Sequence, residues 1–199
     1  ALSLARMADT TQVAALRHRL EVEESTDALW KVIRATETAR ATDALITDLL
    51  PHLEARSPSV RAFTARSLGR LRDPRATRPL LPLLVDPEWR VRVQASRALG
   101  TIGSEAAVEA LASLTDDPVP HVREAAATAL GAIGAEQTAA ALHPLLADPS
   151  IGVRRAATEA AGRITLAEGE RQPLTGRLYQ LLNDPAAPVA AAALGSLAA

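Results

Sequence analysis

The chain has 199 residues, of which 48% are hydrophobic and only 2% aromatic. It contains no cysteine, which excludes disulfides, thiolate metal sites and cysteine nucleophiles. Its formal net charge of −1 gives no bulk attraction to nucleic acid or to an anionic membrane. The sequence has no visible signal peptide and no apolar run of the roughly 18 residues that a membrane span needs.

A pattern, Val-Arg-x-x-Ala-x-x-x-(Leu/Ala)-Gly, recurs along the chain. It starts at Val91, Val122 and Val153, which are 31 residues apart, and Val60-Arg61 lies another 31 residues upstream. A fixed period of about 20–50 residues is typical of proteins built from stacked repeats that bury a shared core. From this period we expect about six helix pairs. The predicted units are residues 9–40, 41–72, 73–103, 104–134, 135–170 and 171–199, after the end of a preceding repeat in residues 1–8.

Both ends of the sequence lie inside this pattern. Residues 4–9 match the repeat ending at 68–73, and Leu197 takes the position of Leu99. We therefore expect a piece of a longer protein, in which a targeting signal or a catalytic domain can lie outside these residues. A cytoplasmic location is favoured.

The first unit, 9–40, fits the pattern least, because Glu37 occupies the place that Leu68 has in the next unit. We still expect helices there. Trp30 lies in this irregular unit, and we interpret it as a packing residue.

The unit 73–103 shows how each repeat should fold. Asp73-Pro74 predicts a helix start, since aspartate caps orphan amides and proline fits the first helical position. An apolar stripe continues to Leu84, and Pro82 within it should bend or break this first helix. Asp86-Pro87 repeats the start signal for a second helix.

The second helix of this unit should bury one face and end at Gly103 as a C-terminal cap. Its apolar residues lie within about 100° of the helix circumference. They are Val91, Ala95, Ala98, Leu99 and Ile102.

The following units copy this arrangement. Helices should start at Ser104 and at Asp117-Pro118, with Gly134 ending the second, and another helix should cover 136–146. A five-residue expansion around 165–173 moves the next valine to Val189, and we expect it in a loop between helices.

These residues resemble the HEAT-repeat family, especially the short bacterial form called the phycobilisome-lyase HEAT-like repeat. The resemblance rests on the Asp-Pro turn, the Val-Arg pair and the Ala-Leu-Gly-x-Ile-Gly ending, and it is strongest across residues 57–164. It implies an all-α fold, a right-handed α-α superhelix (HEAT-like solenoid), with the second helix of each pair on the concave side. It also implies a binding scaffold rather than an enzyme. Glu37, Ala161 and Ala190 depart from the pattern, where the family has Leu, Leu and Arg.

An arginine follows the valine in four units, at Arg61, Arg92, Arg123 and Arg154. Such a ladder could bind an anion. The alternative is structural, because three of these arginines lie six residues after Asp86, Asp117 or Asp148. Each guanidinium could then reach an aspartate of its own or an adjacent repeat. A position that recurs in every unit is typical of a scaffold, so we favour the structural interpretation.

Positions that vary between units are better candidates for function. Counted from each valine, positions −1, +2, +6 and +10 should point away from the buried face. In units 41–72 and 73–103 these positions include Val93 and four arginines, Arg66, Arg70, Arg90 and Arg97. The later units, which include His121, carry side chains of both charges. This basic patch could hold an acidic segment of a partner. It could equally be an ordinary solvated face, which is the simpler interpretation.

Trp89 stands where other units have Pro58, Pro120, Ile151 and Ala187. If it is exposed beside Arg90, it would anchor a peptide, since tryptophan and arginine are enriched at binding hot spots. Alternatively it covers the seam between repeats, and we favour that interpretation.

Enzyme motifs are not found. The histidines, His18, His52, His121 and His143, are scattered, and none is followed by glutamate. A metal site needs three or four converging ligands, and nothing in the sequence converges. No Gly-x-x-x-x-Gly-Lys loop or Gly-x-Ser-x-Gly elbow occurs. We therefore expect no metal, no cofactor and no catalysis within this segment.

The sequence favours a non-catalytic scaffold that binds a protein or peptide segment, such as an acidic one, through the concave face. Nucleic acid binding and membrane insertion are not expected. The predicted contact residues are Arg66, Arg70, Trp89, Arg90, Arg97 and His121. Two alternatives stay open. One is a phycobilisome-lyase-like factor that attaches or removes a bilin, and the other is an accessory repeat region of a larger enzyme such as a cyclophilin-type prolyl isomerase.

Overall fold

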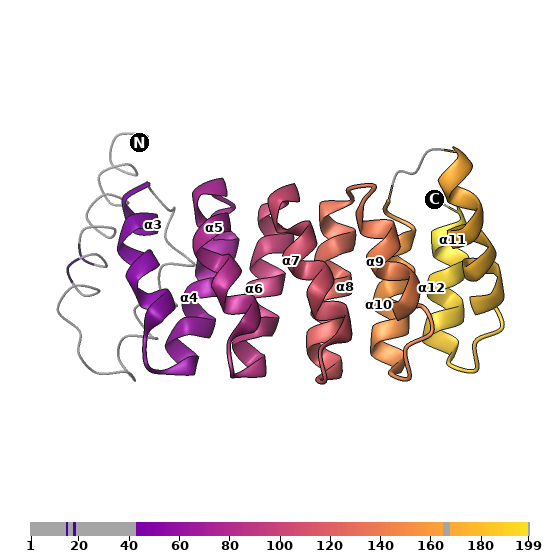
Figure 1. The fold of residues 1–199 in the computed structure, drawn as a ribbon, viewed down its shortest axis with the longest axis horizontal. Coiled ribbons are helices and arrows are strands. Elements are labelled where there is room, and N and C mark those ends of the chain that lie inside the picture. Colours follow the sequence, from indigo (N-terminus) through magenta and orange to yellow (C-terminus); the bar gives the residue numbers. More distant parts are fainter. Residues whose placement is uncertain (1–14, 16–17, 19–42, 165–167, 199) are drawn as a thin grey trace, which may run out of the picture. The chain divides into compact units, whose positions relative to one another are not determined.

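The structure is a computed structural model that describes residues 15, 18, 43–164 and 168–198. The chain divides into two compact units, residues 1–98 (unit 1) and 99–199 (unit 2). All regular secondary structure in the described part is helical, which confirms the all-α expectation (Figure 1). The predicted helices of residues 9–40, with Trp30, lie outside the described residues apart from Ala15 and His18.

Unit 1 alternates a short or broken first helix with a continuous second helix. Its elements in chain order are α3 (Asp43–Leu49), η1 (Leu50–Glu54), α4 (Pro58–Leu71), η2 (Pro74–Ala76), α5 (Thr77–Leu80), η3 (Leu81–Val85) and the part of α6 (Trp89–Ile102) up to Ala98, where η marks a 3-10 helix. Its core is aliphatic, with Leu49, Leu68 and Leu80 fully buried. Leucine and alanine thus supply the burial that aromatic residues supply in most domains.

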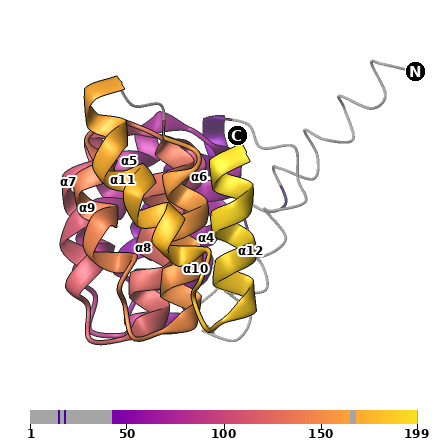
Figure 2. The ribbon, with the colours of Figure 1, turned by 90° about the vertical axis from the view of Figure 1, so that its right-hand side faces the viewer.

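Unit 2 has the same alternation in its first two repeats, whereas the first helix of its last repeat is continuous. Its elements are the end of α6, then η4 (Glu105–Ala107), α7 (Val108–Ala112), η5 (Ser113–Asp116), α8 (Pro120–Ile133), α9 (Thr138–Leu145), α10 (Ile151–Ala161), α11 (Glu168–Leu181) and α12 (Ala187–Ala198). The second helices pack in a row, with α10 against both α8 and α12. In the view along this unit, α7 and α9 lie to the left and α10 and α12 to the right (Figure 2). The helices of unit 2 therefore form two layers.

The apolar face expected of the second helices is present. Val91, Ala95, Ala98 and Leu99 are each at most 3% exposed, and Ile102 is half-buried near the end of α6. Gly103 and Gly134 have positive φ values of 74° and 68° after α6 and α8, as their predicted role at helix ends requires. Helix, turn, helix, turn is confirmed as the local plan.

Asp73 caps η2 with Pro74 as its first residue, as predicted, whereas the Asp-Pro signals at Asp86, Asp117 and Asp148 act slightly differently from the prediction. The second helices begin at Trp89, Pro120 and Ile151, after the aspartate and proline rather than at them. Each aspartate instead accepts a hydrogen bond from the backbone N–H two residues later, as Asp148 does from Ser150 at 2.8 Å. The side chain therefore closes a turn ahead of the helix, which is a common alternative use of aspartate.

The predicted break at Pro82 is found, because α5 ends at Leu80 and a 3-10 helix follows. The equivalent first helix also changes to a 3-10 helix at Ser113, although no proline lies there. The change of helix type therefore belongs to the repeat, and Pro82 is compatible with it rather than its sole cause.

The expansion at 165–173 was expected to form a loop, and this is wrong for most of its length. Residues 168–173 belong to α11, which starts at Glu168, and residues 165–167 lie outside the described part. The added residues therefore lengthen a first helix. No helix in the described part is long and apolar enough to cross a membrane.

Candidate binding surface on the second helices

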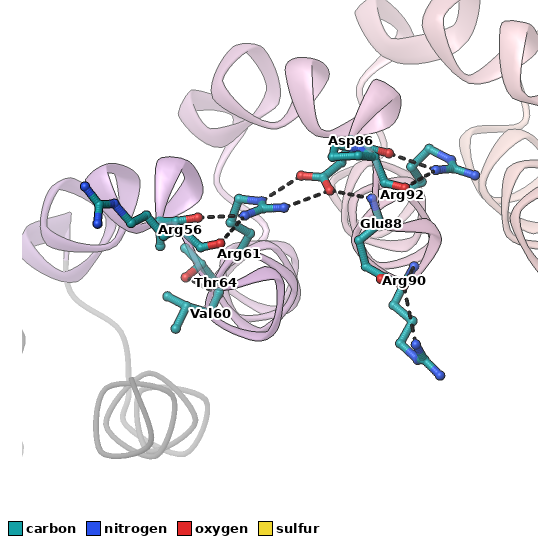
Figure 3. Close-up of polar contacts among 10 residues, drawn as sticks. Arg56, Val60, Arg61, Thr64, Asp86, Glu88, Arg90 and Arg92 are labelled. Atoms are coloured by element: carbon teal, nitrogen blue, oxygen red, sulfur yellow. Dashed lines mark hydrogen bonds and ion pairs between the residues drawn. The ribbon is translucent and has the colours of Figure 1, made fainter. Parts of the chain in front are cut away.

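Three of the repeated arginines, Arg61, Arg123 and Arg154, link neighbouring repeats, as the structural interpretation predicted. Arg61 donates to both carboxylate oxygens of Asp86, from Nε at 2.7 Å and from Nη2 at 2.9 Å (Figure 3). Arg123 makes the same two bonds to Asp148, at 2.7 and 2.9 Å. In each pair the aspartate comes 25 residues after the arginine, in the next repeat. We call these pairs the Arg–Asp clamps, and they are strong because both partners are charged and the bond is bidentate.

The third nitrogen of each clamp arginine is also used. Nη1 of Arg123 donates to the backbone carbonyl of Asp117 at 2.8 Å, and Nη1 of Arg154 to that of Asp148 at 2.9 Å. Arg154 in addition donates to both carboxylate oxygens of Asp184, which is a third clamp. The guanidinium thus joins the turn of its own repeat to the turn of the next one, and its donors are occupied by the scaffold.

The clamps change the acidity of their aspartates. Burial alone would raise the pKa of Asp148, but the hydrogen bonds from Arg123 and from the Ser150 backbone outweigh it, so the pKa lies below its ordinary value. The pKa of Asp86 is lowered in the same way, against burial, by Arg61 and the backbone of Glu88. These carboxylates therefore stay ionised at neutral pH, as the clamps need.

Close approach between second helices explains the repeated glycines. A Cβ placed on Gly69 would lie 2.6 Å from Cα of Ala98, and one placed on Gly100 would lie 2.6 Å from Cα of Ala129. Gly131 would meet Ala160 at least as closely. We call these contacts the glycine seam. Only a residue without a side chain allows the backbones to approach so closely, so these positions too belong to the scaffold.

The side chains that the scaffold does not determine include the predicted arginines of unit 1. Arg70, Arg90 and Arg97 are exposed, and Arg66 is half-buried. The side chain of Arg90 is 68% exposed and contacts Glu88, with Nη1 3.4 Å from the carboxylate. Arg90 points away from Asp86, on the opposite side from the clamp (Figure 3).

Two arginines of this surface lie over aromatic rings. The guanidinium carbon of Arg90 is 4.6 Å from the ring centroid of Trp89, and that of Arg66 is 4.7 Å from the centroid of Phe63. Trp89 is half-buried. Sequence reasoning missed Phe63 as a member of this surface. The signal was its spacing, because residues three apart on a helix are neighbours, as Phe63 and Arg66 are.

His121 belongs to unit 2 and lies in a different electrostatic setting. It is exposed, and its Nδ1 is 3.9 Å from the carboxylate of Glu124. Glu124 also pairs with Arg155 at 3.3 Å, and Arg155 pairs with Glu159 at 2.7 Å. The exposed side of the second helices in unit 2 is therefore a network of both charges, as the sequence predicted for the later units.

One residue expected on the exposed side is buried. Val93 is only 5% exposed, so position +2 of this repeat faces the core. The equivalent positions in unit 2, Glu124 and Arg155, are half-buried. A position 200° from the valine lies on the side opposite the predicted stripe, so the buried surface of α6 extends beyond the single face that the sequence predicts. In the part of the chain that the structure describes, no group of three or more His, Asp or Glu side chains could hold a metal ion.

Comparison with protein families and solved structures agrees with this architecture. A family model for HEAT repeats matches residues 46–131 and 112–198. Comparison with curated protein sequences gives no match.

Among solved structures, this chain is 26% identical to a chain in the complex of CpcE and CpcF of phycocyanin lyase from Nostoc sp. PCC7120, with a TM-score of 0.68, covering 89% of this chain and 74% of that one. A designed armadillo repeat protein in complex with the peptide (KR)4 is 19% identical, with a TM-score of 0.71, covering 92% and 97%. Human deoxyhypusine hydroxylase is 19% identical, with a TM-score of 0.51, covering 98% of each chain. The last two likenesses concern the fold alone.

Proposed function

Because this chain belongs to the HEAT-repeat family, we propose that it is a non-catalytic scaffold that binds a protein segment through the exposed side of its second helices. The contacts that we propose are those predicted from the sequence. They are Arg66, Arg70, Trp89, Arg90, Arg97 and His121.

The observation that carries this proposal is the difference between repeated and varied positions. The Arg–Asp clamps and the glycine seam recur from repeat to repeat and have partners within the scaffold. Position +6, in contrast, holds Arg66, Arg97, Thr128 and Glu159 in successive units. Packing does not require this variation. Contact with a partner whose own surface varies along its length would account for it.

The charge of unit 1 indicates the kind of segment. Its second helices present Arg66, Arg70, Arg90 and Arg97 without interspersed acidic residues at the other varied positions. Electrostatic complementarity therefore favours an acidic segment on unit 1. In unit 2 the acidic and basic side chains neutralise one another, and His121 would add a polar contact there.

A labelled octaglutamate peptide tests this proposal by fluorescence anisotropy, with octalysine as the control peptide. We expect the octaglutamate peptide to bind the wild type, and the variant Arg66→Glu/Arg97→Glu to bind it at least about tenfold more weakly, because two attractive charges become repulsive. The binding should weaken as salt is added.

The matched control is Arg56→Glu/Arg78→Glu, which changes the net charge equally. Both arginines are exposed, one between η1 and α4 and the other in α5, outside the second helices. This variant should bind within about twofold of the wild type, since distant charges are screened. Equal losses in both variants would reject the second-helix surface. Failure of the wild type to bind octaglutamate would reject the acidic partner.

A second candidate function is the handling of a bilin, as in phycocyanin lyase. The identity of 26% over 89% of this chain to a chain of the CpcE and CpcF complex supports it. Mixing the purified chain with phycocyanobilin should then change the visible absorption spectrum of the pigment. An unchanged spectrum would reject this candidate. Competition by octaglutamate would indicate that the propionates of the bilin use the same arginines.

A further inference from the structure

The two arginine–aromatic pairs of unit 1 use residue types that are scarce in this chain. The sequence has one phenylalanine and two tryptophans, and Phe63 and Trp89 both lie beneath an arginine. Arg66 on α4 and Arg90 on α6 are the arginines concerned. Both pairs therefore lie on the second helices, within the surface proposed above to bind a protein segment.

The repeat itself does not require these rings. At the position of Phe63 the following units have Gln94, Ala125 and Ala156. At the position of Trp89 the other units have Pro58, Pro120, Ile151 and Ala187. Residues without a ring system of this size satisfy the scaffold at both positions. The rings thus need an explanation beyond helix packing.

A ring beneath a guanidinium changes what that guanidinium can do. Stacking occupies the flat face of the group and leaves its N–H donors pointing outward in the same plane. It also restricts the rotamers of a long side chain, so less entropy is lost when the donors bind. The outward edge then matches a carboxylate, which can accept two parallel hydrogen bonds.

Arg90 already illustrates this geometry. Its guanidinium lies over Trp89 while the Glu88 carboxylate is 3.4 Å from its Nη1. That distance is longer than the 2.7 Å of the Arg61–Asp86 clamp, so Glu88 holds the group only weakly. A carboxylate from a partner can replace it without breaking a strong bond. The exposed fraction of 68% leaves the side chain accessible.

We propose that Phe63 and Trp89 are positioning residues that hold Arg66 and Arg90 as forks for two side-chain carboxylates of an acidic segment. This inference rests on the proposed function and adds the chemistry of recognition. The segment is selected because its carboxylates each accept two hydrogen bonds from a planar guanidinium group. Negative charge without this geometry does not give tight binding.

Charge-conserving variants test the forks, with the same octaglutamate probe and anisotropy measurement. Arg66→Lys/Arg90→Lys keeps both charges but removes the planar donors, and we expect binding about tenfold weaker than wild type. Arg56→Lys/Arg78→Lys is the matched control and should bind like the wild type. Thermal unfolding followed by circular dichroism checks that both variants stay folded.

Ring variants test the positioning role. Phe63→Leu/Trp89→Leu keeps apolar bulk and both arginines, and we expect binding about threefold to tenfold weaker, because the guanidiniums lose their support. Phe63→Tyr/Trp89→Phe keeps a ring at each position and should restore binding to within about twofold of the wild type. A purely structural role of the rings would change the unfolding temperature and leave the affinity of the folded protein unchanged.

The outcomes separate the two proposals. If the lysine variant binds like the wild type while Arg66→Glu/Arg97→Glu binds weakly, the acidic partner stands and the fork inference is wrong. If the leucine variant keeps full affinity, the positioning role is wrong. If the wild type does not bind octaglutamate at all, the acidic partner and the forks both fail.

Discussion

The buried and the exposed sides of the second helices differ in how far the repeat determines their residues. On the buried side, Gly69, Gly100 and Gly131 each face an alanine of the next second helix. On the exposed side, the +6 position changes from Arg97 to Thr128 one repeat later. Residues that recur in every repeat are therefore the ones that pack the scaffold. Residues that vary between repeats are the better candidates for contact with a partner.

A substitution in the glycine seam should change the free energy of unfolding the most. Gly100→Ala places a Cβ 2.6 Å from the backbone of Ala129, and we expect it to reduce the free energy of unfolding by about 2–3 kcal/mol, because two helices must separate. Urea unfolding followed by circular dichroism measures this.

The control is the same substitution on the exposed side of a second helix. No atom lies within 4 Å of a Cβ placed on Gly195 in α12. Gly195→Ala should therefore stabilise the protein by about 0.5–1 kcal/mol, since alanine favours helix more than glycine does. Two variants with equal effects would contradict the contrast between the two sides.

A substitution in an Arg–Asp clamp should have an intermediate effect on the free energy of unfolding. Asp148→Asn removes the charge that pairs with Arg123, whose side chain is only 14% exposed, and keeps an oxygen for the Ser150 N–H. We expect a loss of about 2 kcal/mol in the free energy of unfolding, because a largely buried guanidinium loses its counter-charge.

The comparison for this variant is an exposed pair of the same residue types. Arg75 pairs with Asp73 at 2.7 Å, but the arginine side chain is 54% exposed. Asp73→Asn should reduce the free energy of unfolding much less than Asp148→Asn does, as exposed ion pairs contribute little. A larger loss from Asp73→Asn than from Asp148→Asn would show that burial does not govern these pairs.

A decrease in pH should have the smallest effect on stability as long as the solution stays near neutral. The pKa of Asp86 and of Asp148 is lowered in the folded chain despite burial, and hydrogen bonding by Arg154 lowers the pKa of Asp184. The unfolded chain therefore binds protons more readily, so this stabilisation is complete above the ordinary aspartate value of 3.8 and decreases as pH falls below it.

The unfolding temperature, measured from pH 7 downward, should change little until about pH 4 and then fall. Arg123→Gln removes the hydrogen bonds that lower the pKa of Asp148, so its fall should be shallower than that of the wild type. Parallel curves for the two proteins would mean that the clamp does not link stability to pH.

The sequence predicts the scaffold well because the same buried, turn-forming and charge-paired residue types recur from repeat to repeat. The period predicts the helix pairs that the described residues form. The six-residue spacing between Asp117 and Arg123 predicts that the arginine pairs with an aspartate of its own or an adjacent repeat. Which aspartate each arginine reaches could not be read from spacing alone. The fold decides that, by placing Asp148 of the next repeat against Arg123.

Features for which one residue has two possible local structures were harder to predict. The aspartate of an Asp-Pro pair can cap a helix or close a turn, and the structure has the turn at Asp86, with Oδ1 accepting from the Glu88 N–H. Val93 was expected outside because the pattern predicts one buried face on each second helix, whereas α6 also buries a residue on the opposite side. The stacking of Arg66 on Phe63 needed side-chain geometry, although the spacing of three was visible.

The Arg154–Asp184 pair has a consequence for how this chain tolerates changes in length. Its two residues are 30 apart instead of 25, yet the bonds of 2.8 and 3.0 Å nearly equal those of Arg123 and Asp148. Part of the added length lies in α11, and the turn at Asp184 still pairs with Arg154. The alignment of these two turns therefore depends on the arginine–aspartate pair and not on a fixed number of residues between its partners.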